Sequence, residues 1–163
     1  MTEEILANYE HSSGPVFTIA VPYARLTDAT PTVSNPCELL SVLAGTQLCG
    51  TLISTDAADS IAIVNVATGF IGNWEVRNVL TYAANIEDTW GAINVGDPIY
   101  YDNSATMPAG VYLSTSPLDN LGVANTLFGH IACITSEAAA LYPKGGVIAS
   151  TQDCQVMQRG AGV

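Results

Sequence analysis

Basic residues are scarce in this chain of 163 residues. It has 15 Asp and Glu residues but only four Lys and Arg residues, so its formal net charge is −11; the four are Arg25, Arg77, Lys144 and Arg159. Proteins that bind nucleic acid or anionic lipid use clusters of Lys and Arg, which release counterions from phosphate groups. We therefore expect a protein that binds neither nucleic acid nor a membrane.

Long apolar runs are also missing. No stretch approaches the ~20 consecutive apolar residues that a transmembrane helix needs. The chain starts with the acidic sequence Met-Thr-Glu-Glu-Ile-Leu, which lacks the basic and apolar regions of a secretory signal. These absences predict a soluble protein that is made in the cytoplasm.

The cysteines do not follow a metal-binding or redox pattern. The four cysteines contain no C-x-x-C pair, as zinc knuckles and thioredoxin-like sites require; they are Cys37, Cys49, Cys133 and Cys154. Because cytosolic thiols are kept reduced, we expect four reduced and mostly buried cysteines.

Recognisable catalytic motifs are absent as well. The glycines match neither the phosphate-binding loop nor the dinucleotide fingerprint. The aspartates at 56, 59, 97 and 102 lack the spacing of a calcium loop, so we interpret them as turn formers. His130 and Cys133 lie three residues apart, and such a pair on a regular strand points to opposite faces of the sheet. We predict no enzyme, no catalytic residue, no cofactor and no metal, with a small hydrolase assembled from distant residues kept as an alternative.

What the chain does contain is apolar and β-forming. It is 48% hydrophobic and only 12% charged, which predicts one folded domain with part of its surface against other protein. Short β-branched runs separated by turn residues predict an all-β fold, either a small β-barrel or a sandwich. The expected strands are 39–43, 51–54, 61–66, 98–101, 111–114, 127–134, 146–149 and 155–158, and one or two short helices are expected at 85–92 and 136–141.

The N-terminal residues differ from the rest. A polar start and Gly14-Pro15 precede an apolar run at 16–21, and a Thr-, Asp- and Pro-rich stretch follows it. We predict an extended N-terminal arm at 1–30, with at most one edge strand, and a barrel domain at 31–163. An ordinary first strand of the barrel, preceded by a frayed tail, is the alternative.

The most informative segment is 94–102, with the sequence Asn-Val-Gly-Asp-Pro-Ile-Tyr-Tyr-Asp. It predicts a turn at Gly96-Asp97 and a strand that Pro98 can begin, because the first residue of a strand need not donate to the ladder. Alternation places Ile99 and Tyr101 on one face. A polar loop follows, and the sequence Phe-Gly-His-Ile-Ala comes later at 128–132.

These residues resemble a small family of phage proteins that is related to head-decoration, or cement, proteins. The family has a Val-Gly-Asp-x-hydrophobic-Tyr-aromatic-Asp turn and strand, then a variable loop, then a Phe/Ile-Gly-x-Ala strand; residues 95–102 and 128–132 match these elements. The proline-rich segment before residue 40 and the insertion at 115–125 lie outside the pattern. We interpret both as candidate contacts specific to one capsid.

The resemblance implies a β-barrel or β-tulip domain, usually trimeric, on the outer face of a phage head. Its partner would be the major capsid protein, and the protein would be made in the host cytoplasm. The acidic charge fits the outer face, since the inner face meets packaged DNA. We expect the homotrimer to bridge capsid subunits, with the N-terminal arm reaching across a subunit boundary.

Aromatic residues and arginine are enriched at the centres of interfaces, which selects the candidate contact residues. These are Phe17, Tyr23 and Arg25 in the arm, with Trp74 and Trp90 as possible anchors. For each tryptophan, packing in the barrel core is the alternative. The second functional hypothesis is a carbohydrate- or receptor-binding module of a phage tail or fibre, in which tyrosines and tryptophans stack on sugars.

Overall fold

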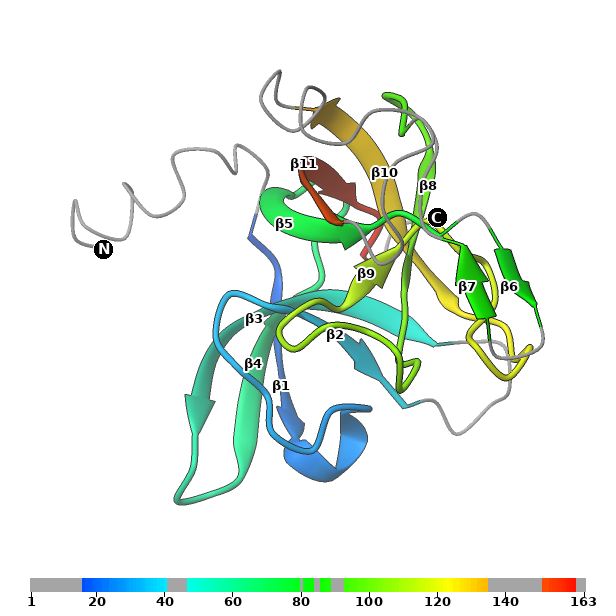
Figure 1. Ribbon diagram of the computed structural model, residues 1–163. Helices are drawn as coiled ribbons and strands as arrows, with labels where there is room; N and C mark the ends of the chain where they lie inside the picture. The colour runs from blue at the N-terminus through cyan, green and yellow to red at the C-terminus, as the bar shows by residue number, and fades with distance from the viewer. Residues whose placement is uncertain are drawn as a thin grey trace.

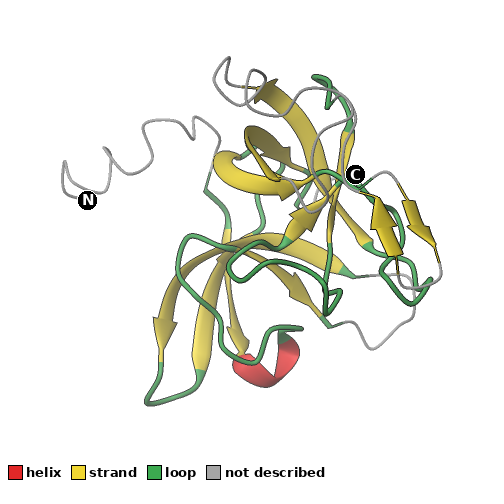
Figure 2. Ribbon diagram, viewed as in Figure 1, coloured by secondary structure: helices red, strands yellow, loops and turns green. Residues whose placement is uncertain are grey.

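The computed structural model describes residues 16–40, 47–79, 81–83, 86–88, 93–134 and 151–160. Within these ranges the protein is all-β, and its only helix is the three-residue 3-10 helix η1 (Tyr23–Arg25) (Figure 2). The predicted fold class, a small β-barrel, is confirmed. No helix in the described ranges has the length and apolar character needed to cross a membrane.

Five strands form a closed barrel in the order β10-β11-β5-β9-β8 (Figure 1). They are β5 (Ile71–Arg77), β8 (Pro98–Tyr101), β9 (Leu113–Ser114), β10 (Thr126–Ile134) and β11 (Thr151–Gln158). Neighbours are antiparallel except β5 and β9, which pair in parallel over two residues. The barrel encloses the first core, which includes Val76, Ile99, Leu113, Phe128 and Val156.

A second sheet has the order β1-β4-β3-β2 and is antiparallel throughout. Its strands are β1 (Thr18–Pro22), β2 (Pro36–Leu39), β3 (Leu48–Asp56) and β4 (Ile61–Asn65). One face carries the second core, formed by Leu26, Cys37, Leu52, Ala62, Val64 and Val66. A separate hairpin pairs β6 (Thr81–Ala83) with β7 (Ile86–Asp88).

The N-terminal segment contacts both edges of this second sheet. Residues 18–22 pair with β4 on one side. After η1, Leu26 pairs with Leu39 of β2, and the amide of Leu40 donates to the carbonyl of Arg25 at 2.7 Å. The predicted edge strand is therefore present and is part of the folded sheet. Residues 1–15 lie outside the described residues, so the role of an arm across a subunit boundary stays a prediction.

One buried amide joins the barrel to the second sheet. Gln158, at the end of β11, is only 1% exposed. Its Oε1 accepts a hydrogen bond from Thr51 Oγ1 at 2.7 Å, and its Nε2 donates to the carbonyls of Asn65 and Ala67 at 3.0 and 2.9 Å. A buried amide is costly unless it is hydrogen-bonded, so this arrangement fixes β11 against β3 and the end of β4.

The two parts of the sequence motif lie in neighbouring strands. β8 pairs with β10, with Ile99 opposite Gly129. Ile99 and Tyr101 are 0% and 2% exposed, as their alternation predicts. A Cβ atom on Gly129 would lie 2.0 Å from the carbonyl oxygen of Met157, so only glycine lets β10 approach β11 this closely. Gly96 has φ +92°, a value that the turn before β8 requires and that favours glycine.

Most predicted strands are found, with shifted ends. The predictions 61–66 and 98–101 match β4 and β8, and 51–54, 111–114, 127–134 and 155–158 overlap β3, β9, β10 and β11. The prediction 39–43 overlaps β2 at Leu39, where the strand ends, and residues 41–43 lie outside the described residues. β5 was not predicted, since Gly72 and Asn73 interrupt its apolar pattern. The predicted strand 146–149 and the predicted helix 136–141 lie outside the described residues.

The helix predicted at 85–92 is wrong at its centre. Residues 86–88 form β7, which pairs antiparallel with β6. Glu87 and Asp88 suggested the acidic first turn of a helix. Pairing with the β-favouring sequence Thr-Tyr-Ala at 81–83 overrides that weak local preference.

Replacing Gln158 by Met should lower the free energy of unfolding by about 2–4 kcal/mol, because two carbonyls and one hydroxyl lose a buried partner while the side-chain volume is kept. Gln155→Met on the same strand is the matched control, since Gln155 is only half-buried, and it should change stability by less than about 0.5 kcal/mol. Urea unfolding of both variants measures the difference. Equal losses would show that the Gln158 amide does not join the two units.

Candidate functional site

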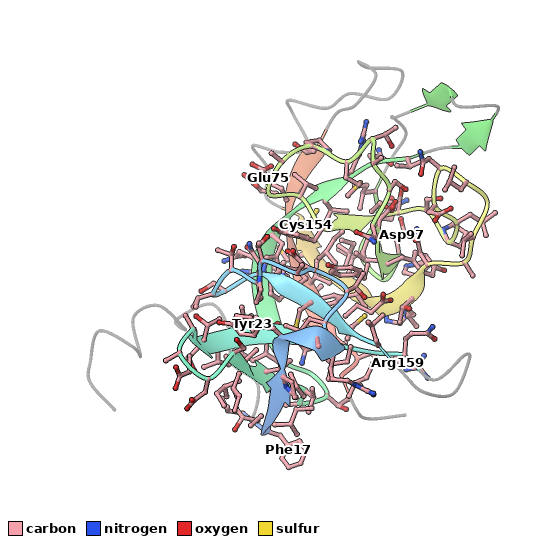
Figure 3. All side chains as sticks on the ribbon, turned by 90° about the horizontal axis from the view of Figure 1, so that it is seen from below. Phe17, Tyr23, Glu75, Asp97, Cys154 and Arg159 are labelled. Atoms are coloured by element: carbon pink, nitrogen blue, oxygen red, sulfur yellow. The ribbon has the colours of Figure 1, made fainter. Side chains whose placement is uncertain are left out.

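The three predicted contact residues of the N-terminal segment differ in their surroundings. Phe17 is 60% exposed and projects away from the body of the protein (Figure 3). Tyr23 packs against the second core, and the Arg25 guanidinium donates to the carbonyl of Leu40 at 2.7 Å. Phe17 is therefore available for contact, whereas Tyr23 and Arg25 also hold the protein's own sheet. Their role at an interface stays a prediction.

Trp74 belongs to the barrel, so the predicted contact residues do not form one site. Its ring packs edge-to-face against Phe128, with 5.2 Å between centroids, and lies over Gly72. Its indole N–H donates to the carbonyl of Ser34 at 2.9 Å. Core packing, the alternative kept for this residue, accounts for most of these contacts. Trp90 lies outside the described residues.

Residues 117–125 form a loop, here named the apolar loop, that presents aliphatic side chains to solvent. Asp119 orders it, because one carboxylate oxygen accepts from the amides of Leu121 and Val123, both at 2.8 Å. Leu118 also pairs with Ala124 across the loop. The exposed fractions are 45% for Leu118, 78% for Leu121 and 61% for Val123. Their exposure is thus held in place by internal hydrogen bonds.

A buried polar network connects the apolar loop to the sequence motif. Asp102, the last residue of the motif, is 2% exposed. Its carboxylate accepts from the hydroxyls of Ser104 and Ser114, at 2.5 and 2.6 Å. The Ser104 hydroxyl accepts from the amide of Asn120 at 3.0 Å, inside the loop. The last residue of the sequence motif therefore anchors the apolar loop.

A groove of about 540 Å³ lies beside β5 and β11. β9 pairs with β5 only at residues 76 and 77, so residues 71–75 form an edge that β9 does not cover. The groove is lined by Asn35, Pro36, Asn73, Trp74, Glu75, Gly110, Tyr112, Leu113, Asp153 and Gln155. Aromatic, amide and acidic side chains thus meet in one hollow, which gives it the character of a binding site.

Two carboxylates of the groove stand opposite each other. The register of β5 and β11 places Glu75 directly opposite Asp153, and Asn73 opposite Gln155. Both acidic residues are exposed. The sequence analysis missed this pair, because the two residues are far apart in the chain and only the strand register brings them together. The apolar loop did carry a local signal, since its aliphatic residues alternate with Pro, Asp, Asn and Gly.

His130 and Cys133 do not follow the regular alternation of side chains that would place them on opposite faces of the sheet. The register of β10 against β11 shifts between Ile131 and Cys133, so a bulge interrupts the alternation. His130 is half-buried and Cys133 is exposed, whereas Ile131 between them is 2% exposed. Expectations about catalysis therefore rest on the absence of a motif, not on this geometry.

The aspartates interpreted as turn formers act as such at two positions. An Asp56 carboxylate oxygen accepts from the amides of Ala58 and Asp59 at 3.0 and 3.3 Å, and Asp97 accepts from the amide of Asn94 at 2.8 Å. Within the described ranges no group of three or more His, Cys, Asp or Glu residues is arranged to hold a metal ion.

None of the four cysteines forms a disulfide, and three are buried while Cys133 is exposed. The predicted burial is thus found for three of the four thiols, and their reduced state stays a prediction. Burial raises the pKa of Cys37 and of Cys154 to about 12, and it raises the pKa of Cys49 well above the usual value. Such thiols stay protonated at neutral pH, so they are poor nucleophiles.

Comparison with known proteins adds no relative. No family model matches the chain, and no curated protein or solved structure does.

In the native protein at about pH 8, a thiol reagent such as Ellman's reagent should modify one cysteine per chain, Cys133. The raised pKa and the burial of the other three keep the reactive thiolate from forming and the reagent from reaching it. All four should react in denaturant, and Cys133→Ser should abolish the native reaction. Rapid native labelling of Cys37 or Cys154, read by peptide mass spectrometry, would contradict this assignment.

Proposed function

We propose that this protein is a structural virion protein that binds the outer surface of a phage capsid and stabilises the head by bridging major capsid subunits. The resemblance to decoration proteins rests on two sequence elements, and these elements occupy β8 and β10, which pair directly. The residues behind the resemblance thus form one continuous part of the barrel, which supports treating them as one motif.

The apolar loop is the observation that carries the proposal. Soluble proteins expose single aliphatic side chains routinely, but a loop that holds three of them outward by its own hydrogen bonds marks a contact surface. The loop lies outside the pattern of the family, as a contact adapted to one capsid would. Hydrogen bonds from Asn120 to Ser104 and from Ser104 to Asp102 connect the loop to the sequence motif.

Charge and multiplicity complete the proposal. A net charge of −11 suits the outer face of a head, away from packaged DNA. A homotrimer attached at three points gains affinity from multivalency, so each contact can be small. We propose that the protein is located in the virion and that its partner there is the major capsid protein.

Quantitative mass spectrometry of purified virions tests the function directly. We expect about one copy of this chain per major capsid protein, because a coat that bridges subunits must cover the head evenly. A few copies per particle, or none, would contradict a role as head-coating protein.

Replacing Leu121 and Val123 together by Ser should weaken binding to undecorated heads by about tenfold or more, since both side chains would be buried in the contact. Val95→Ser is the matched control, because Val95 is 66% exposed but lies outside the apolar loop. Thermal stability should stay the same in both variants. Sedimentation with heads measures binding, and an unchanged affinity of the double variant would remove the loop from the interface.

The groove beside β5 favours a second candidate function, a carbohydrate- or receptor-binding module of a tail or fibre. Trp74 and Tyr112 line it together with amide and carboxylate side chains, a combination that sugar-binding sites use. Retention of the protein on a glycan array, together with a low copy number in virions, would favour this function over the first.

A further inference from the structure

The groove keeps an unfavourable charge arrangement that the fold alone does not need. Glu75 and Asp153 are directly opposite on neighbouring strands, and like charges in that position destabilise a sheet. None of the residues that line the groove is Lys, Arg or His. A ligand that brings positive charge would therefore meet two carboxylates and no competing cation among the lining residues.

The uncharged walls of the groove are held in fixed positions. The Trp74 ring is oriented by its hydrogen bond to Ser34, and Tyr112 stacks on Tyr101 with 6.2 Å between ring centroids. Next to the two carboxylates, Asn73 stands opposite Gln155 and adds two amide oxygens as acceptors. Carboxylates, amide oxygens and aromatic rings thus surround the same hollow.

We propose that this groove binds the guanidinium group of an arginine side chain on a partner polypeptide. A guanidinium offers five N–H donors in a planar fork, which suits a pair of carboxylates and neighbouring amide oxygens, and it stacks on aromatic rings. An ammonium is compact and strongly hydrated, so it gains less from aromatic walls. Calcium takes six to eight oxygen ligands, a number that two carboxylates and two amides reach only when both carboxylates bind through both of their oxygens.

Charge complementarity identifies the partner by its chemistry. This chain carries −11 and has four basic residues, so a strongly acidic surface meets a partner that contributes the cation. The identification of the partner as a capsid subunit rests on the function proposed above. The binding of a guanidinium group is inferred from the side chains that line the groove and does not depend on that function.

The test is a titration of the full ¹⁵N-labelled chain, at low ionic strength, with N-acetyl-arginine methylamide, followed by NMR. The matched probe is the citrulline compound, which has nearly the same shape but a neutral ureido group. We expect the arginine compound to shift the amide signals of Asn73, Glu75, Asp153 and Gln155 in a saturable way. The citrulline compound should leave them in place, because it carries no charge to pair with the carboxylates.

Three variants assign the effect to the groove. Glu75→Gln and Asp153→Asn should each weaken the binding of the arginine compound by about tenfold. Asp59→Asn, which removes an exposed carboxylate from the turn between β3 and β4, should leave it unchanged. Glu75→Gln should also raise the midpoint of thermal unfolding by about 1–3 °C, because it removes the repulsion between opposed charges.

Several results would overturn the inference. These are equal binding of the arginine and citrulline compounds, no saturable shift with the arginine compound, or binding that neither Glu75→Gln nor Asp153→Asn weakens. Tighter binding of CaCl₂ or methyl glucoside at the same residues would reassign the groove to a metal or a sugar. The outcome is separable from the proposed function, because virion copy number reports on the latter independently of guanidinium binding.

Discussion

The hydrogen bonds of the Gln158 side chain are the constraint on which the rest of the structure depends. The barrel and the four-stranded sheet each have a core of their own, although Cys49 of β3 packs in the barrel core. The side-chain amide at the end of β11 satisfies groups from β3 and from the end of β4. Apolar contact between the two units would tolerate small displacements. A buried amide does not, because every partner that it loses is left without water.

A second buried polar group, the carboxylate of Asp102, performs a similar task directly after β8. It holds Ser104 and Ser114, and through Ser104 it reaches the apolar loop. An acidic residue that ends a motif would ordinarily be interpreted as a surface or catalytic group. Here it organises a loop, so the exposed position of Leu121, which is 78% exposed, depends on an acidic side chain that is only 2% exposed.

Local pattern predicted those parts of the fold that local interactions determine. β4 is a short apolar run that ends at Asn65, and β8 follows the turn at Gly96-Asp97; both were predicted with at most one residue of error. β5 has glycine and asparagine where apolar residues would signal a strand. Its partner β11 (Thr151–Gln158) lies far along the sequence, so no local pattern indicates their pairing. The residues of the groove likewise include some that local sequence indicates and some that only the strand pairing brings together. Trp74 could be selected by residue type, whereas the opposition of Glu75 and Asp153 exists only once the register of β5 and β11 is set.

The position of β11 at the end of the described chain also bears on how the protein is made. Thr51 and Gln158 are 107 residues apart in the sequence, and β11 is the strand that fills the barrel between β5 and β10. Both neighbours of β11 precede it in the sequence, so during synthesis β5 and β10 each carry a strand edge that has no partner until β11 has been made. Closure of the barrel therefore depends on contacts between residues far apart in the chain, which slows folding. Until β11 inserts, edge-to-edge aggregation competes with closure of the barrel.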